Sequence, residues 1–234
     1  MTIMEDKFRK CRAILLDFGG TLDSDGEHWL DRFFELYQQA GLDCPRDEIE
    51  RVFYLADRIC CKNPLVDRLG LRELMKYHVR LQFEALKLRD RTREDSLVEG
   101  FCSKTEKILQ RNSLLLGRLK NRYRLGVVSN FYGNVETLCD EAGLSEHLDV
   151  ILDSTRVGLS KPDPEIFLLA AKKMNVEPAE IIFVGDSHER DIMPARGLGM
   201  KTVWLKGANM RLPENPGPVD CRISSLPELE LFLS

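Results

Sequence analysis

The sequence predicts an α/β fold, in which a parallel β-sheet is covered by helices and a helical segment interrupts the chain after the first strand. Five short apolar runs have the length and composition of buried strands: Ala13–Leu16, Leu125–Ser129, Val150–Leu152, Ile181–Gly185 and Thr202–Leu205. Segment 27–112, between the first run and the second, has helical periodicity and no convincing strand. Helix signals separate the later runs, and this alternation is typical of a parallel sheet.

The helical insert contains three apolar stripes. The first is Leu30, Phe33, Phe34 and Tyr37, which follow the i, i+3, i+4, i+7 pattern of an amphipathic helix. The second is Leu71, Leu74, Met75, Val79, Phe83 and Leu86, and the third begins with Leu97, Phe101 and Ile108. We therefore divide the chain into a core domain, residues 1–23 and 113–234, and a helical domain, residues 24–112.

The second half of the chain carries clear helix boundaries. Asp163 followed by Pro164 is a start signal, and the expected helix places Ile166, Ala170 and Met174 on one face. Another helix is expected over residues 134–142, with its end near Gly143. Segment 213–218, between two prolines, is predicted to be a turn-rich loop.

Composition narrows the class of protein. The 234 residues include 34 Lys and Arg against 38 Asp and Glu, a net charge of −4, which argues against nucleic acid as the main partner. No run approaches the roughly 18 apolar residues of a membrane helix, and the N-terminus lacks the apolar segment of a secretion signal. We expect a cytoplasmic protein without membrane contact, either monomer or homodimer, whose seven cysteines are free thiols.

Polar residues occupy the carboxyl ends of three of the apolar runs. Asp17 follows the first, Ser129 ends the second, and Asp186 follows the fourth. Lys161 lies in the loop "SKPDPEIF" after the third run, and Asp191 follows Asp186 by five residues. Ligands of open parallel sheets gather at the carboxyl ends of the strands, so these five side chains are expected to form one site.

This set of side chains suits an anionic substrate held together with a divalent metal. Clustered carboxylates repel one another, and a hard cation such as Mg²⁺ with oxygen ligands relieves the repulsion. The metal and Lys161 would neutralise a phosphate that Asp17 otherwise repels. A carboxylate can then attack phosphorus and form an aspartyl-phosphate. Gly19 and Gly20 would let backbone groups approach the ligand closely.

Four motifs, in order along nearly the whole chain, resemble those of the haloacid dehalogenase (HAD) superfamily. They are "LLDFGGTLD", "VVSN", "SKPDPEIF" and "FVGDSHERDI". The resemblance implies a Rossmann-like core with the helical insert as a cap over the active site. It also implies a Mg²⁺-dependent hydrolase, most readily a phosphatase acting on a small phosphorylated metabolite.

The resemblance further implies a role for each polar residue. Asp17 would be the nucleophile, and Mg²⁺ would be held by Asp17, Asp186, Asp191 and the backbone carbonyl of Gly19. The residues implied to bind the phosphate are Gly20 and Asn130, through backbone donors, and Ser129 and Lys161.

Gly19 departs from the family pattern. Phosphatases of the family usually carry a second aspartate at this position, which protonates the leaving oxygen and later activates water. Loss of a general acid or base typically costs 10²- to 10⁴-fold in rate, or about 3 to 5 kcal/mol of barrier. We therefore expect weak turnover with retained binding, unless His188, Asp23, Asp25 or Lys62 supplies a substitute.

Three alternatives remain open at this point. Phosphonoacetaldehyde hydrolases of the superfamily also lack the second aspartate and use a cap lysine as a Schiff base, for which Lys62, in an apparent interhelical loop, is the candidate. A non-catalytic protein that binds phosphate or a partner is also compatible with Gly19. Dehalogenases rank last, because they place tyrosine at that position and work without Mg²⁺, whereas "GDSHERD" is typical of a metal site.

Overall fold

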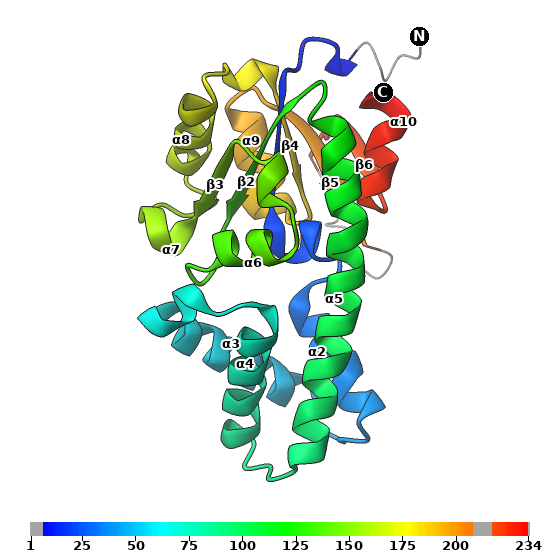
Figure 1. Ribbon diagram of the computed structural model, residues 1–234, viewed down its shortest axis with the longest axis vertical. Helices are drawn as coiled ribbons and strands as arrows, with labels where there is room; N and C mark the ends of the chain where they lie inside the picture. Colours follow the sequence, from blue (N-terminus) through cyan, green and yellow to red (C-terminus); the bar gives the residue numbers. More distant parts are fainter. Residues whose placement is uncertain (1–6, 208–216, 234) are drawn as a thin grey trace.

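The computed structural model describes residues 7–207 and 217–233 and contains a parallel sheet of six strands (Figure 1). Their order is β3-β2-β1-β4-β5-β6. The strands are β1 (Ala13–Leu16), β2 (Arg124–Ser129), β3 (Val150–Asp153), β4 (Ile181–Gly185), β5 (Lys201–Leu205) and β6 (Cys221–Ile223). The predicted α/β class with a Rossmann-like parallel sheet is confirmed. The predicted loop 213–218 lies largely outside the described residues.

Alternate side chains of the central strands enter two different apolar layers. On β1, Ala13 and Leu15 pack with α8 (Pro164–Met174) and α9 (Met193–Gly197) on one face. Ile14 and Leu16 belong to the layer on the other face. That layer includes α6 (Val135–Glu141), α10 (Glu230–Leu233) and the last turns of α5 (Arg91–Leu119). Because both faces are covered, the central strands β1 and β4 are apolar and buried throughout.

The predicted helix boundaries in this half agree closely with the structure. Asp163 caps α8, where its Oδ1 accepts a hydrogen bond of 3.0 Å from the backbone N of Glu165. The helix expected over 134–142 is α6, and Gly143 follows it with φ +65°. Strand β6 was not predicted, because three residues are too few to show an apolar period. The described part of the core also contains the short helix α7 (Ser154–Val157).

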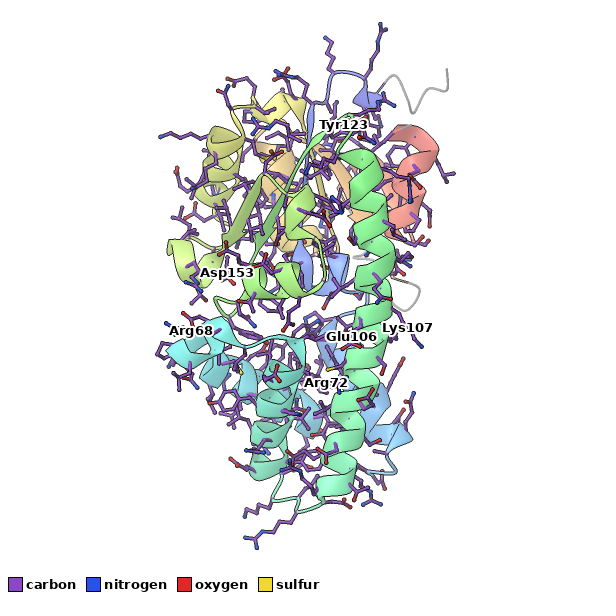
Figure 2. All side chains as sticks on the ribbon, in the orientation of Figure 1. Arg68, Arg72, Glu106, Lys107, Tyr123 and Asp153 are labelled. Atoms are coloured by element: carbon purple, nitrogen blue, oxygen red, sulfur yellow. The ribbon has the colours of Figure 1, made fainter. Side chains whose placement is uncertain are left out.

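The insert is helical and lies at the carboxyl-end edge of the sheet (Figure 1). Its helices are α2 (Trp29–Gln39), α3 (Arg46–Lys62), α4 (Leu71–Ala85) and most of α5. Figure 2 shows Arg72 of α4 facing Glu106 of α5, at 3.6 Å between nitrogen and oxygen. Residue 112 lies inside α5, which runs unbroken from the insert to the sheet. The proposed domain boundaries therefore stay a prediction.

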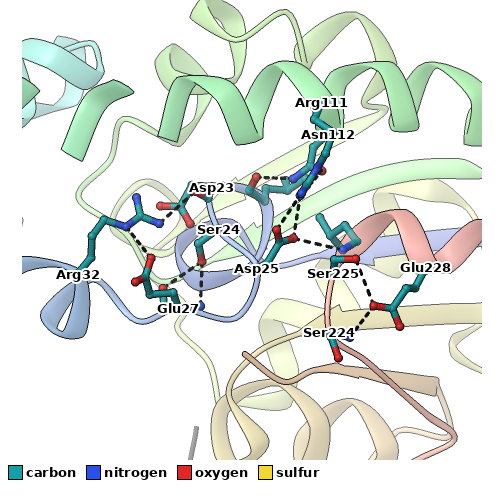
Figure 3. Close-up of polar contacts among 12 residues, drawn as sticks. Asp23, Ser24, Asp25, Glu27, Arg32, Arg111, Asn112, Ser224, Ser225 and Glu228 are labelled. Carbon is teal, nitrogen blue, oxygen red and sulfur yellow. Dashed lines mark hydrogen bonds and ion pairs between the residues drawn. The ribbon is translucent and has the colours of Figure 1, made fainter. Parts of the chain in front are cut away.

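The first connection between sheet and insert is held against α5 (Figure 3). Arg111 donates two hydrogen bonds, of 2.8 and 2.7 Å, to the carboxylate of Asp25. The amide of Asn112 donates to the backbone O of Leu22 at 2.8 Å. Arg32 pairs with Glu27 at 3.1 Å. These contacts fix the path by which the chain leaves the sheet and begins α2.

Among the described helices, none is long and apolar enough to span a bilayer.

Candidate active site

The residues expected to form the site line one cavity of about 260 Å³. Asp17, Ser129 and Asp186 follow or end β1, β2 and β4, which are neighbours in the sheet. The cavity is lined by all eight predicted residues: Asp17, Gly19, Gly20, Ser129, Asn130, Lys161, Asp186 and Asp191. The topology thus brings together side chains that are up to 174 positions apart in sequence.

Three buried carboxylates form the centre of the site. Asp17, Asp186 and Asp191 are exposed to only 7%, 6% and 0%. Each offers an oxygen within 4.8 Å of the others. Gly20, at φ +89°, permits this approach, because a Cβ there would lie 2.5 Å from Asp186 Oδ2. A Cβ at Gly185 would likewise lie 2.5 Å from Asp191 Oδ2.

Lys161 is the cation of this cluster. Its Nζ lies 2.8 Å from Asp17 Oδ1 and 2.6 Å from Asp191 Oδ1. The side chain of Asn130 holds the lysine in place, since its Oδ1 accepts from the Lys161 backbone N and its Nδ2 donates to the Lys161 O, both at 2.8 Å. Asn130 therefore has a side-chain role that was not expected from the sequence, and its backbone role in phosphate binding stays a prediction.

The charges of the cluster do not balance. Three carboxylates face one ammonium, so the ionised cluster carries a net charge of −2 in a buried place. Burial raises the pKa of Asp186 well above its usual range, and the charges of Asp17 and Asp191 raise it further. Burial lowers the pKa of Lys161, but Asp17 and Asp191 outweigh this and raise it overall. A carboxylate set with this excess charge fits a divalent cation with oxygen ligands.

Comparison with known proteins agrees with this arrangement. A family model described as haloacid dehalogenase-like hydrolase matches residues 11–199, more than half of the chain. The chain belongs to this family. The HAD-like chain is 38% identical over 119 residues to haloacid dehalogenase-like hydrolase domain-containing protein 3 of Bos taurus, covering 51% of the chain and 44% of the relative. A protein of the same name from Danio rerio is 28% identical over 230 residues, covering 93% and 94%.

Other relatives of the HAD-like chain are named for their activities. Pyrimidine 5'-nucleotidase YjjG of Escherichia coli is 30% identical over 121 residues, covering 51% of the chain and 53% of the relative. The match thus spans about half the length of this relative and of the bovine one. Among solved structures, a dehalogenase shares the fold with a TM-score of 0.65 at 18% identity, covering 96% and 98%. A HAD phosphatase from Thermococcus onnurineus has a TM-score of 0.54 at 25% identity, covering 95% and 98%.

Gly19 has room for a larger side chain. Its φ of −71° and ψ of 120° are values that any residue adopts. A Cβ there would meet only Phe131, at 3.4 Å, which is an ordinary contact. The missing second aspartate of this HAD-like hydrolase is therefore a chemical difference that the backbone does not require.

The two acids considered as substitutes near Gly19 are engaged elsewhere and do not line the cavity. Asp23 is fully buried; its Oδ1 accepts from the Gly20 backbone N at 2.7 Å, and its Oδ2 accepts from the Trp29 indole. The Gly20 N–H, expected to bind phosphate, is thus occupied by Asp23 in this arrangement. Asp25 pairs with Arg111 (Figure 3).

The other two candidates also lie outside the cavity lining. The ring of His188 packs on Trp204, with 5.2 Å between centroids. Lys62 is exposed and is the last residue of α3, so the expectation of an interhelical loop facing the core is wrong. Lys161 is the lysine among the described residues that lines the cavity.

Asp23 gives a pH-dependent prediction for stability. Burial raises its pKa from 3.8 to about 6, so the folded state binds a proton that the unfolded state has lost between these values. The free energy of unfolding should therefore fall as pH rises from about 4 to 6, by up to about 3 kcal/mol from this group. Urea unfolding without metal at several pH values would measure this slope. Asp23→Asn should make it shallower, and an unchanged slope would contradict the assignment.

Several residues that line the cavity were not predicted as site residues from the sequence. His28 and Trp29 come from the start of α2, and Phe131 and Tyr132 from the loop after β2, while α3 contributes Phe53, Asp57 and Cys61. The α3 residues recur every four positions, a helical signal that does not reveal which face meets the core.

Burial and then Arg190 lower the pKa of His28, whose Nδ1 accepts from the Leu30 backbone N at 3.2 Å.

The loop that carries Phe131 and Tyr132 is held by Asp153, at the carboxyl end of β3 (Figure 2). Its Oδ2 accepts from the backbone N of Gly133 at 2.8 Å and of Val135 at 3.2 Å. The buried carboxylate of Asp153 therefore positions the aromatic wall of the cavity and does not itself line it.

Proposed function

We propose that this HAD-like hydrolase is a Mg²⁺-dependent phosphatase that dephosphorylates a small phosphorylated metabolite through an aspartyl-phosphate on Asp17. The observation that carries the proposal is the buried cluster of three carboxylates and one lysine at the carboxyl ends of the strands. Its excess negative charge suits a divalent cation, and the cation with Lys161 suits a phosphate. A relative named as a pyrimidine 5'-nucleotidase supports phosphate-ester chemistry.

Asp17 is oriented for attack on phosphorus. Its Oδ1 accepts from the Phe18 backbone N at 2.7 Å and from Lys161 at 2.8 Å, which leaves Oδ2 to form the new bond. As the bond to Oδ2 forms, the phosphorus–oxygen bond to the leaving group breaks, and the leaving group departs as an alkoxide or aryloxide that takes a proton from water. A second water then cleaves the aspartyl-phosphate, which releases inorganic phosphate and restores Asp17. Lys161 and the Ser129 hydroxyl would bind the phosphoryl oxygens. Bound Mg²⁺, held by Asp17, Asp186, Asp191 and the Gly19 carbonyl, would neutralise charge on the transferring group.

The cap would exclude bulk water during this step, because side chains of α2 and α3 close one side of the cavity. Gly19 offers no proton to the leaving oxygen and no base to the attacking water. Turnover should therefore be weak and should depend on how acidic the leaving alcohol is. A non-catalytic phosphate-binding role is the second candidate, since none of the four substitutes considered lines the cavity. The alternative in which a cap lysine forms a Schiff base loses support, because Lys62 does not line the cavity.

The test is phosphate release from a panel of phosphomonoesters, with Mg²⁺ and with a chelator. We expect Mg²⁺-dependent release that is faster for aryl than for alkyl esters. A rate of phosphate release that is the same with and without the chelator would contradict the proposal. Binding of Mg²⁺ and beryllium fluoride without any release would favour the non-catalytic role.

The metal site gives a separate prediction. Asp186→Asn removes one charged ligand, so the affinity for Mg²⁺ should fall at least tenfold, by analogy with the 10- to 100-fold effects of outer-shell changes. Titration calorimetry measures this directly, and Mg²⁺ protection against thermal unfolding gives an independent readout. Glu189→Gln is the control, because it removes one negative charge at an exposed position three residues from Asp186 and should leave the affinity for Mg²⁺ unchanged. Unchanged Mg²⁺ affinity in Asp186→Asn would count against the site.

A further inference from the structure

We propose that Asp57 of the cap selects a substrate whose leaving group carries a positively charged amine. The inference rests on the proposed function only in placing the phosphate at Asp17, and it adds the chemical class of the rest of the molecule. Asp57 lines the same cavity as Asp17 but belongs to α3, so it faces the part of a ligand that extends away from the sheet.

The carboxylate of Asp57 has one oxygen occupied and one available. Its Oδ1 accepts a hydrogen bond from the Tyr132 hydroxyl and lies 3.1 Å from His78 Nε2. The side chain is 27% exposed, and Asp57 is one of the residues that line the cavity. Oδ2 has no hydrogen-bond partner among the described residues, and it is not sealed from solvent. The free oxygen is therefore placed to accept a hydrogen bond from a ligand.

A buried chain of hydrogen bonds holds this carboxylate in place. Gln82 Nε2 lies 2.8 Å from His78 Nδ1, and the Tyr37 hydroxyl lies 3.2 Å from Gln82 Oε1. These three side chains are fully buried. With the Gln82 amide donating to Nδ1, the proton of His78 is on Nε2 and points to Asp57. A carboxylate fixed before binding loses little entropy when a ligand arrives.

The charge of Asp57 has no cationic side chain to balance it. No lysine or arginine among the described residues lies within 4.0 Å of it, whereas Asp17 and Asp191 share Lys161. Arg190, the guanidinium of the cavity, is also outside that distance. A ligand ammonium would supply the missing partner, and hydrogen bonds between charged groups are the strong ones.

The aromatic residues around Asp57 favour a cation over an anion, although Arg190 also lines the cavity. The same cavity has an aromatic wall made by Trp29, Phe53, Phe131 and Tyr132. Ring centroids of Phe131 and Tyr132 lie 4.7 Å apart, and those of Trp29 and Phe131 lie 5.4 Å apart. Aromatic faces attract ammonium groups through the negative face of the ring. The Asp57 carboxylate and the aromatic rings therefore both favour a leaving group that carries a positively charged amine.

The experiment compares two phosphonates that differ only in this charge: 3-aminopropylphosphonate and n-butylphosphonate, in which a methyl replaces the ammonium. Neither contains a phosphate ester, so calorimetric titration of the Mg²⁺-loaded wild-type protein measures binding without turnover. We expect the amine to bind at least tenfold more tightly, as for a hydrogen bond between charged groups. Asp57→Asn should remove this preference and leave the affinity for n-butylphosphonate within about twofold.

Glu50→Gln, an equal change of charge at an exposed position of α3, should keep the preference. Equal affinities in the wild type, or no binding of either phosphonate, would overturn the inference whatever the variants do. A preference that persists in Asp57→Asn would also overturn it, as would equally tight binding of 3-hydroxypropylphosphonate. Hydrolysis of phosphate esters is measured in a separate experiment from phosphonate binding. Amine preference without ester hydrolysis rejects only the proposed phosphatase, and hydrolysis without amine preference rejects only the role of Asp57.

Discussion

Asp17→Asn is expected to lower Mg²⁺-dependent phosphate release by at least about four orders of magnitude, because the amide oxygen cannot form the aspartyl-phosphate. The fold should be retained. The substituted side chain keeps an oxygen that can accept from the Phe18 backbone N, and Lys161 keeps its contact with Asp191 at 2.6 Å. Removing one charge from a cluster with excess negative charge should leave the unfolding temperature without metal no lower than that of the wild type.

The measurement is steady-state phosphate release with an aryl phosphate, together with thermal unfolding of both proteins. Asp140→Asn changes the same side chain at an exposed position of α6 and should leave both readouts unaltered. Release from Asp17→Asn at the wild-type rate would eliminate Asp17 as the nucleophile. A variant that is inactive and also unfolded would show that the structural argument for the retained fold is wrong.

Gly19→Asp is expected to raise turnover of alkyl phosphates by roughly 10²- to 10⁴-fold, the usual contribution of a general acid and base. The backbone at residue 19 already has φ and ψ values open to aspartate, and its Cβ would meet Phe131 at an ordinary distance of 3.4 Å. For aryl phosphates the gain should come from the restored base alone, because their leaving groups need little help from an acid whereas hydrolysis of the aspartyl-phosphate still needs a base.

Gly19→Asn is the matched control, because it has nearly the same shape and cannot transfer a proton. We expect Gly19→Asn to stay close to the wild type in turnover of both classes of ester. Equal gains in the two variants would attribute the effect to packing against Phe131. If the wild type releases phosphate, no gain in Gly19→Asp would show that another residue already serves as the acid and base.

The site could be predicted from the sequence to the extent that it depends on strand ends. Asp17, Ser129 and Asp186 each mark the end of an apolar run, and parallel pairing places such ends at one edge. Lys161 does not end a strand, and it was assigned to the site from its loop after the third apolar run and from its motif. The hydrogen bonds from the Asn130 side chain that hold it depend on two loops meeting in space, which no local pattern reveals.

The cap half of the cavity could not be predicted in the same way. A helical period says that one face of α3 is buried, but not that Phe53, Asp57 and Cys61 line a cavity. Asp23 shows the opposite error: its closeness to Gly19 in sequence suggested a catalytic substitute. The carboxylate does not line the cavity; it lies behind the lining, fully buried, and accepts hydrogen bonds from Gly20 and Trp29. Side-chain direction in a tight turn depends on tertiary partners.

The formation of an aspartyl-phosphate is tested most directly by pre-steady-state reaction with p-nitrophenyl phosphate. Its leaving group needs no proton from residue 19, whereas hydrolysis of the intermediate lacks the base. An aspartyl-phosphate on Asp17 should give a rapid, Mg²⁺-dependent burst of nitrophenolate equal to the amount of protein, followed by slow release, with no burst in Asp17→Asn. Steady release without a burst, or a burst that persists in Asp17→Asn, would contradict a slowly hydrolysed intermediate on Asp17.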